Sequence, residues 1–253
     1  MLILLSPAKT LDEMPLNLSI KSTDPYFQKE IRELVAVMRK KSSDDLQKLM
    51  GVSKKIAELN YQRYQDFSEK YTNQNSKPSL FMFKGEVYNE MQVADYKESD
   101  LNFAQKHLYI ISGLYGLLRP LDKMQPYRLE MSTRLKTKFG KNLYDFWGNR
   151  IVTTLNKSEE SDVLINLASK EYFSSVNTAM FNGRIVNIHF KVNKGGALKV
   201  VGIIAKRARG SMADYIIKNK IRNLELIKNF KGQGFRFDEK LSNLENFVFV
   251  KST

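Results

Sequence analysis

Charged and nucleophilic side chains recur at one kind of place in this sequence, directly after a short apolar run. The side chains in these positions are Lys9, Lys84, Glu86, Ser112, Tyr115, Ser169, Lys170, Glu171 and Arg209. If the runs are strands of one sheet, their carboxyl ends meet at an edge where loops and free amides form ligand sites. The cations would then hold an anion, and Glu86 or Glu171 would move protons. A plainer interpretation stays open, because any strand that leaves a core turns polar.

The longest of these stretches, LYIISGLYGLLRPLDKMQPYRLEM, covers residues 108–131. In it, Arg119 and Arg128 are each followed within three residues by an acid, Asp122 and Glu130 respectively. Two interpretations remain open. Either the arginines line a cleft, or each pairs with its acid and braces a long loop.

A second cluster of cations precedes a helix start signal. Ser211 and Asp214 fit the capping-box spacing, which predicts a helix that begins at Met212. Lys206, Arg207 and Arg209 lie just before that start. Free amides at a helix N-terminus, flanked by three cations, favour an anion site that includes Ser211.

Residues 46–64 resemble a helix-hairpin-helix element, in which a tight turn and the second helix grip a DNA phosphate. Gly51 and Ser53 occupy the turn, and Lys54 and Lys55 add charge. The usual second glycine is replaced by Ser53, which suits a helix N-cap. An ordinary antiparallel helix pair is the alternative.

The bulk composition favours an anionic partner. The chain has 253 residues, with 41 Lys and Arg against 27 Asp and Glu, and a net charge of +14. Residues 185–222 hold nine of the cations and a single acid, so this segment carries +8 of the total. Charge concentrated in this way favours nucleic acid, although a basic surface without a partner is the alternative.

Composition also excludes several kinds of site. There is no cysteine and there are only two histidines, so disulfides, thiolate centres and the usual zinc or iron ligand sets are not expected. No apolar run is long enough to span a membrane, and the first residues do not form a signal peptide. We expect a cytoplasmic monomer with no cofactor, no metal and no membrane partner.

These residues require a sheet to position them. Strands are predicted at 2–6, 80–84, 108–112, 162–168, 185–192, 198–206 and 247–251. Helices are predicted at 26–41, 43–50, 53–70, 97–106, 141–157 and 211–229. The order favours an α/β (mixed α+β) fold, a single compact domain over 1–253 with a mixed central sheet surrounded by helices. Residues 24–75 are interpreted as an inserted helical subdomain, and residues 72–79 as a linker back to the sheet.

Several of these motifs together resemble the YaaA family of bacterial peroxide stress proteins. They are MLILLSPAKTLD, FKGEVY, the 108–131 stretch, LYDFWG, VLINLASKEYF and KRARGSMADYII, in that order along the chain. The resemblance implies a cytosolic protein of the hydrogen peroxide response that limits free iron and protects DNA. It further implies a positively charged cleft, a helix-hairpin-helix element and double-stranded DNA binding. By position, the hairpin falls on residues 50–57, and the cleft includes Lys9, Arg119, Arg128, Lys170 and Arg209.

Two hypotheses of function follow. The first is a stress protein that binds double-stranded DNA through its phosphates, without strong sequence specificity. The second is an enzyme for a small anionic or nucleotide-like substrate, in which Lys9, Lys170 and Arg128 hold the anion and Glu86 or Glu171 moves protons.

Overall fold

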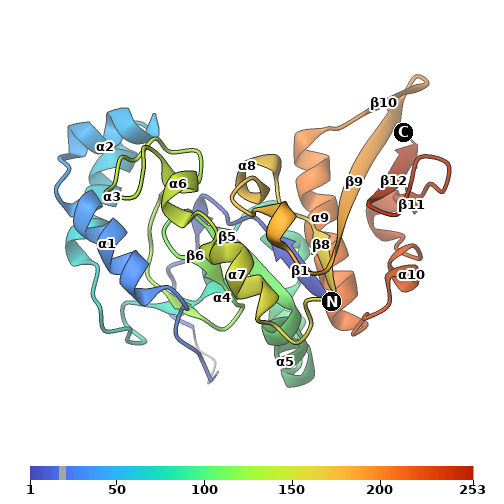
Figure 1. The fold of residues 1–253 in the computed structure, drawn as a ribbon, viewed down its shortest axis with the longest axis horizontal. Coiled ribbons are helices and arrows are strands. Elements are labelled where there is room, and N and C mark those ends of the chain that lie inside the picture. The colour runs from blue at the N-terminus through green and yellow to red at the C-terminus, as the bar shows by residue number, and fades with distance from the viewer. Residues whose placement is uncertain (17–20, 253) are drawn as a thin grey trace.

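A mixed sheet forms the centre of the protein. The computed structural model describes residues 1–16 and 21–252, and its large sheet has the strand order β11-β12-β9-β8-β1-β5-β6, with β10 paired to β9 (Figure 1). The strands are β1 (Leu2–Leu5), β5 (Leu108–Ser112), β6 (Gly116–Leu118), β8 (Val163–Asn166), β9 (Arg184–Lys194), β10 (Ala197–Lys199), β11 (Arg236–Phe237) and β12 (Asn246–Ser252). This confirms the predicted fold class.

Five neighbouring strands run parallel, which fixes where a site can form. β5, β1, β8, β9 and β12 are parallel to one another, whereas β6, β10 and β11 are antiparallel additions. The carboxyl ends of the five parallel strands therefore lie along one edge. Because β1 pairs with β5 on one side and β8 on the other, the direction of chain progression reverses there, and ligand crevices form at such a reversal.

Helices surround the sheet and form a separate group at one end. Helices α1 (Gln28–Arg39), α2 (Ser43–Met50) and α3 (Lys54–Asp66) lie at the end of the molecule opposite β9 and β12 (Figure 1). The remaining helices are α4 (Ser79–Met82), α5 (Glu98–His107), α6 (Leu143–Trp147), α7 (Arg150–Asn156), α8 (Lys170–Phe173), α9 (Gly202–Lys218) and α10 (Leu224–Ile227). Helices α5 and α9 contact each other, and they contact β1 and β9 respectively.

Two strand predictions were wrong. Residues 79–82 form helix α4, and only the two residues of β4 (Phe83–Lys84) are extended, paired with β2 (Thr10–Leu11). Of the strand predicted at 198–206, only β10 exists, and helix α9 begins at Gly202. The run VVGIIA is apolar enough for either structure. The helical spacing of the buried residues Ala205, Ala208 and Met212 decides the outcome.

Other boundaries differ less. The predicted helix at 141–157 is broken at Gly148, which separates α6 from α7. The predicted helix at 211–229 begins nine residues earlier and ends at Lys218, before the short α10. The predicted helix at 43–50 coincides with α2. Two further short strands, β3 (Lys77–Pro78) and β7 (Lys123–Met124), pair at the end of the predicted linker.

Candidate functional site

Two serines link the loops that follow β1 and β8, where the direction of chain progression in the sheet reverses. Ser6 follows β1, Ser169 follows the neighbouring β8, and the Ser169 amide donates to Ser6 Oγ at 2.8 Å. The two hydroxyl oxygens are 3.3 Å apart. Tyr88 reaches the same place, because its hydroxyl donates to the Ser6 carbonyl at 2.8 Å. These bonds hold the loops that carry Lys9, Lys170 and Glu171 at the carboxyl edge of the sheet.

A hollow of about 430 Å³ opens beside these loops. We call this cavity the strand-end hollow. It is lined by Lys9, Lys48, Leu49, Met50, Glu130, Ser132, Thr133, Arg134 and Glu171. Two separately predicted features therefore meet here. The end of α2, which is part of the hairpin element, forms one wall, and the loops after β1 and β8 form another.

Both acidic side chains of the strand-end hollow already have partners within the protein. Glu130 Oε1 accepts from Arg128 at 3.0 Å and lies 3.2 Å from Lys9 Nζ. Glu171 Oε1 accepts from both the amide and the hydroxyl of Ser132, at 3.1 and 2.8 Å. In contrast, no carboxylate in the described ranges lies within ion-pair distance of Lys48 or Arg134. The hollow therefore presents cations to solvent while its carboxylates point at protein donors.

The α2–α3 hairpin has a turn that suits close approach of a partner. Helix α2 begins with a capping box between Ser42 and Asp45 and ends at Gly51, which has a left-handed φ of 61°. No atom lies within 4 Å of a Cβ built on Gly51, so the turn is open on that side. Ser53 caps α3, because its Oγ accepts from the amide of Ile56. Exposed Lys54 and Lys55 stand in the first turn of α3, which carries no acid.

The two arginines of the 108–131 stretch both face acids. The guanidinium of Arg119 donates to Asp122 at 2.7 Å, and that of Arg128 donates to Glu130. Asp122 is fully buried, and burial raises its pKa, an effect that the bonds from Arg119 partly offset. Arg119 does not line the strand-end hollow, and Arg128 reaches it only through Glu130. Bracing of the loop is therefore the interpretation that the contacts favour.

The helix start predicted at Met212 was wrong, because residue 212 lies in the middle of α9, and the free amides expected before it are therefore absent. Lys206, Arg207, Arg209 and Ser211 all lie inside α9. Arg207 is ion-paired with Glu86, and this hydrogen bond lowers the pKa of Glu86. Glu86 is therefore a paired carboxylate rather than a base aimed at the strand-end hollow. Lys84 is likewise 3.9 Å from Asp12.

Arg209 has a different environment from its neighbours. Its Nε is buried and makes no hydrogen bond within the described part of the chain. Burial lowers the pKa of its guanidinium. Lys170, the first residue of α8, also has no ion pair to another described residue, but it does not line the strand-end hollow.

Gly210 sets how closely α9 approaches the loop that carries Glu86. A Cβ at this position would overlap the carbonyl oxygen of Val87. We expect Gly210→Ala to lower the free energy of unfolding by about 2 kcal/mol, because forced overlap outweighs the higher helix propensity of alanine. Urea denaturation measures this change. The matched control is Gly202→Ala in the same helix, where nothing lies within 4 Å of the added carbon. Equal effects of both changes would contradict the packing account.

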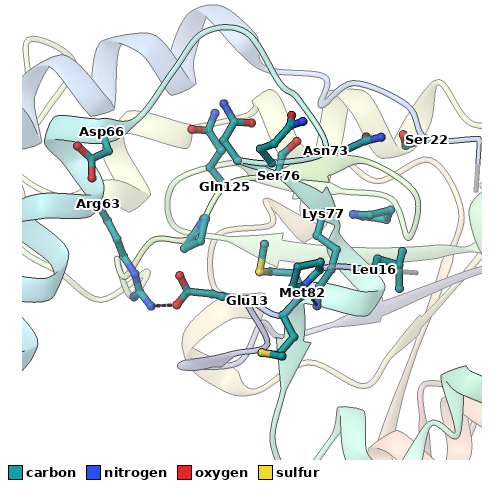
Figure 2. A pocket seen from close by; sticks show the side chains of 16 residues that line it. Glu13, Leu16, Ser22, Arg63, Asp66, Asn73, Ser76, Lys77, Met82 and Gln125 are labelled. Atoms are coloured by element: carbon teal, nitrogen blue, oxygen red, sulfur yellow. Dashed lines mark hydrogen bonds and ion pairs between the residues drawn. The ribbon is translucent and has the colours of Figure 1, made fainter. Parts of the chain in front are cut away.

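A second cavity, of about 530 Å³, was missed by sequence reasoning (Figure 2). Its rim holds Asn73, Gln74, Asn75 and Ser76, which were interpreted as a linker. Its ionisable lining residues are Glu13, Arg63, Asp66 and Lys77, so its formal charge is balanced in a strongly basic protein. None of the predicted site residues lines this cavity. Only the amide-rich composition of residues 73–76 could have suggested it.

The described residues contain neither a membrane-spanning helix nor a cluster of metal ligands. No helix within them is long and apolar enough to cross a membrane. No group of three or more His, Cys, Asp or Glu side chains among them could hold a metal ion.

Comparison with known proteins gives a consistent result over the whole chain. Residues 1–241 match the family described as peroxide stress protein YaaA. A UPF0246 protein of Acaryochloris marina is 48% identical over 255 residues, covering 100% of both chains. UPF0246 proteins of Aliivibrio fischeri and Legionella pneumophila are 47% and 44% identical, covering 98% or more of each chain.

Proposed function

This chain belongs to the YaaA family of peroxide stress proteins, and on that premise we propose that it binds double-stranded DNA in the cytosol during peroxide stress. Binding is through phosphates, without strong sequence specificity. Cations on the protein displace the counterions of the duplex. Displaced iron(II) would generate oxidants away from the DNA, which limits iron-dependent damage.

One observation carries the proposal. Lys48, Leu49 and Met50 of α2 line the same hollow as Lys9 and Arg134. The open turn of the α2–α3 hairpin follows Met50 directly, so it adjoins the strand-end hollow and its unpaired cations Lys48 and Arg134. A phosphate backbone that contacts the turn would pass these cations, and such contacts position a duplex without distinguishing bases.

The enzyme hypothesis has weaker support from the geometry. Of the five residues to which the enzyme hypothesis gives a role, only Lys9 and Glu171 line the strand-end hollow. Glu171 accepts two hydrogen bonds from Ser132, and Glu86 is paired elsewhere. The Lys9 side chain is 66% exposed, so the hollow is open to solvent. An open basic surface favours a polyanion over a small substrate that must be enclosed.

The test removes three charges on this surface. We expect Lys48/Lys54/Lys55→Ala to weaken binding to a 30-base-pair duplex by about 100-fold at 0.1 M salt, if each lysine neutralises one phosphate. Fluorescence anisotropy measures the affinity.

A matched control removes three charges at the opposite edge of the sheet. Exposed Lys106, Lys157 and Lys240 lie before β5, β8 and β12, at the amino ends of these strands, and no carboxylate of the described chain lies within ion-pair distance of them. Alanine at these three positions is expected to change affinity by less than about threefold, through net charge alone. If both triple variants lose affinity equally, binding is diffuse and the proposed surface is wrong.

A further inference from the structure

The long strand β9 continues past the body of the sheet into a projecting ribbon. Here the basic ribbon means residues 191–203, which comprise the end of β9, a turn at Gly195 and Gly196, β10, and the start of α9. Every residue from Lys194 to Val200 is exposed. Figure 1 shows β10 at the far tip of this projection.

The basic ribbon lies in a long stretch of the sequence that contains no acidic residue. No Asp or Glu occurs between Glu171 and Asp214. The cations in that interval are Arg184, Lys191, Lys194, Lys199, Lys206, Arg207 and Arg209. Apart from Arg207, which pairs with Glu86, none of them has a carboxylate within ion-pair distance in the described chain. The ribbon is therefore an uncompensated positive surface.

Apolar side chains stand among these cations, which a solubility role does not explain. Leu198, Val200 and Ile203 are 39%, 63% and 51% exposed. Leu198 and Val200, here called the apolar strip, alternate with Lys199 along β10 and the residue after it, and Ile203 follows in the first turn of α9. Exposed apolar groups of this size, rimmed by charge, mark a contact surface.

Charge selects the partner of this strip. A second copy of the chain would bring together two molecules of net charge +14 through their basic ribbons, so self-association there is opposed. A two-stranded ribbon fits a groove of duplex DNA, and DNA-bending proteins insert apolar side chains between base pairs while neighbouring cations hold the phosphates. The ribbon combines these three properties: width, charge and exposed apolar side chains.

The position of the ribbon agrees with that partner. β9 is parallel to β1 and β8, so its carboxyl end lies along the same edge of the sheet as the strand-end hollow. This carboxyl edge of the sheet faces the top of Figure 1, where α2 lies at the left and β10 at the right. A duplex laid along the edge would meet the α2–α3 hairpin at one end and the ribbon at the other.

We propose that the basic ribbon is a second DNA contact that bends the duplex, with Leu198 and Val200 wedged between base pairs and Lys194 and Lys199 on the flanking phosphates. This inference rests on the proposed function. It adds that bound DNA is deformed, by roughly 20–90° for wedges of this kind.

Energy transfer between dyes on the two ends of a short duplex tests the proposal. Wild-type protein is expected to raise the transfer efficiency on binding. Leu198→Asn/Val200→Asn, which keeps every charge, is expected to abolish that rise while the affinity falls less than about tenfold, since phosphate contacts remain. The matched control is Leu241→Asn/Leu244→Asn, whose side chains are 41% and 75% exposed at the amino end of β12. The control is expected to bend DNA as wild type does.

Three outcomes would overturn the inference. One is a wild-type complex without bending, and another is equal bending by both double variants. In the third, the ribbon variant bends DNA as wild type does but no longer binds the anionic phospholipid vesicles that wild-type protein binds. That result would assign the strip to a membrane surface. If wild-type protein binds no duplex even at low salt, the proposed function itself fails, and this result is distinct from the other three. Circular dichroism melts of each variant confirm that it is folded.

Discussion

Asp122→Ala is expected to lower the free energy of unfolding by about 3–5 kcal/mol, the loss typical of breaking a buried ion pair from one side. The carboxylate is completely buried. It accepts from Thr23 Oγ1 at 2.6 Å, from the Arg119 amide at 2.7 Å, and from the Arg119 guanidinium at 2.7 Å. Alanine removes the acceptor of each of these bonds, and of the three donors the Arg119 guanidinium keeps a bond to the carbonyl of Asp24.

The effect is large because three chain segments meet at Asp122. Its carbonyl accepts from the Ser79 amide, and the adjacent Lys123 amide donates to the carbonyl of Thr23. The 119–124 loop therefore ties residue 23 to the start of α4. Asp122 contributes to stability rather than to binding, since Arg119 is held away from the strand-end hollow.

Equilibrium urea denaturation measures the Asp122→Ala effect. Asp95→Ala is the matched control, because Asp95 is exposed and is expected to contribute less than about 0.5 kcal/mol. A loss below about 1 kcal/mol for Asp122→Ala would mean that water satisfies the stranded donors. The loop would then be braced mainly by its backbone bonds.

DNA affinity is expected to fall on the order of 10³-fold or more when salt is raised from 50 to 200 mM, for about six neutralised phosphates. The physical reason is counterion release. Each protein cation that replaces a condensed counterion makes the binding free energy more favourable, and this contribution grows as the bulk salt concentration falls. The exposed cations of this surface can supply this many contacts; they are Lys9, Lys48, Lys54, Lys55, Arg134 and Lys170.

Affinity titrations at four or more salt concentrations measure the slope. Duplexes of unrelated sequence but equal length are expected to agree within about threefold, because phosphates carry no sequence information. The Lys48/Lys54/Lys55→Ala variant is expected to reduce the slope by about 2.7, and the Lys106/Lys157/Lys240→Ala control to leave it near the wild-type value. A shallow slope for wild type, or strong preference for one sequence, would contradict phosphate binding.

Local patterns in the sequence predicted much of the fold. Strand β1 and the first four residues of β5 are unbroken apolar runs, and α2 has both a capping box and a terminal glycine. Helix α9 was mispredicted because VVGIIA is equally apolar as a strand. Its helical identity shows in the packing of its buried residues against the sheet and against η1 (Tyr88–Glu90), where Gly210 lies against the carbonyl of Val87.

The strand-end hollow could be predicted only in part. Lys9 and Glu171 were found because strand ends converge in parallel sheets. Lys48 and Arg134 were not, because they come from a helix wall and a loop whose relative position is set by the tertiary fold. The Arg119–Asp122 pair is three residues apart, so the sequence could propose it, but only burial shows that bracing is its role.

The central place of β1 has a consequence for synthesis. β1 pairs with Leu108–Ile110 on one side and Leu164–Asn166 on the other. At about 5–20 residues per second, the second partner leaves the ribosome roughly 8–32 s after β1 does. Until Ile110 has emerged, the apolar segment LILL has neither neighbour, and until Asn166 has emerged it has only one. The nascent chain is therefore most exposed to aggregation, and most dependent on chaperones, before Asn166 has emerged.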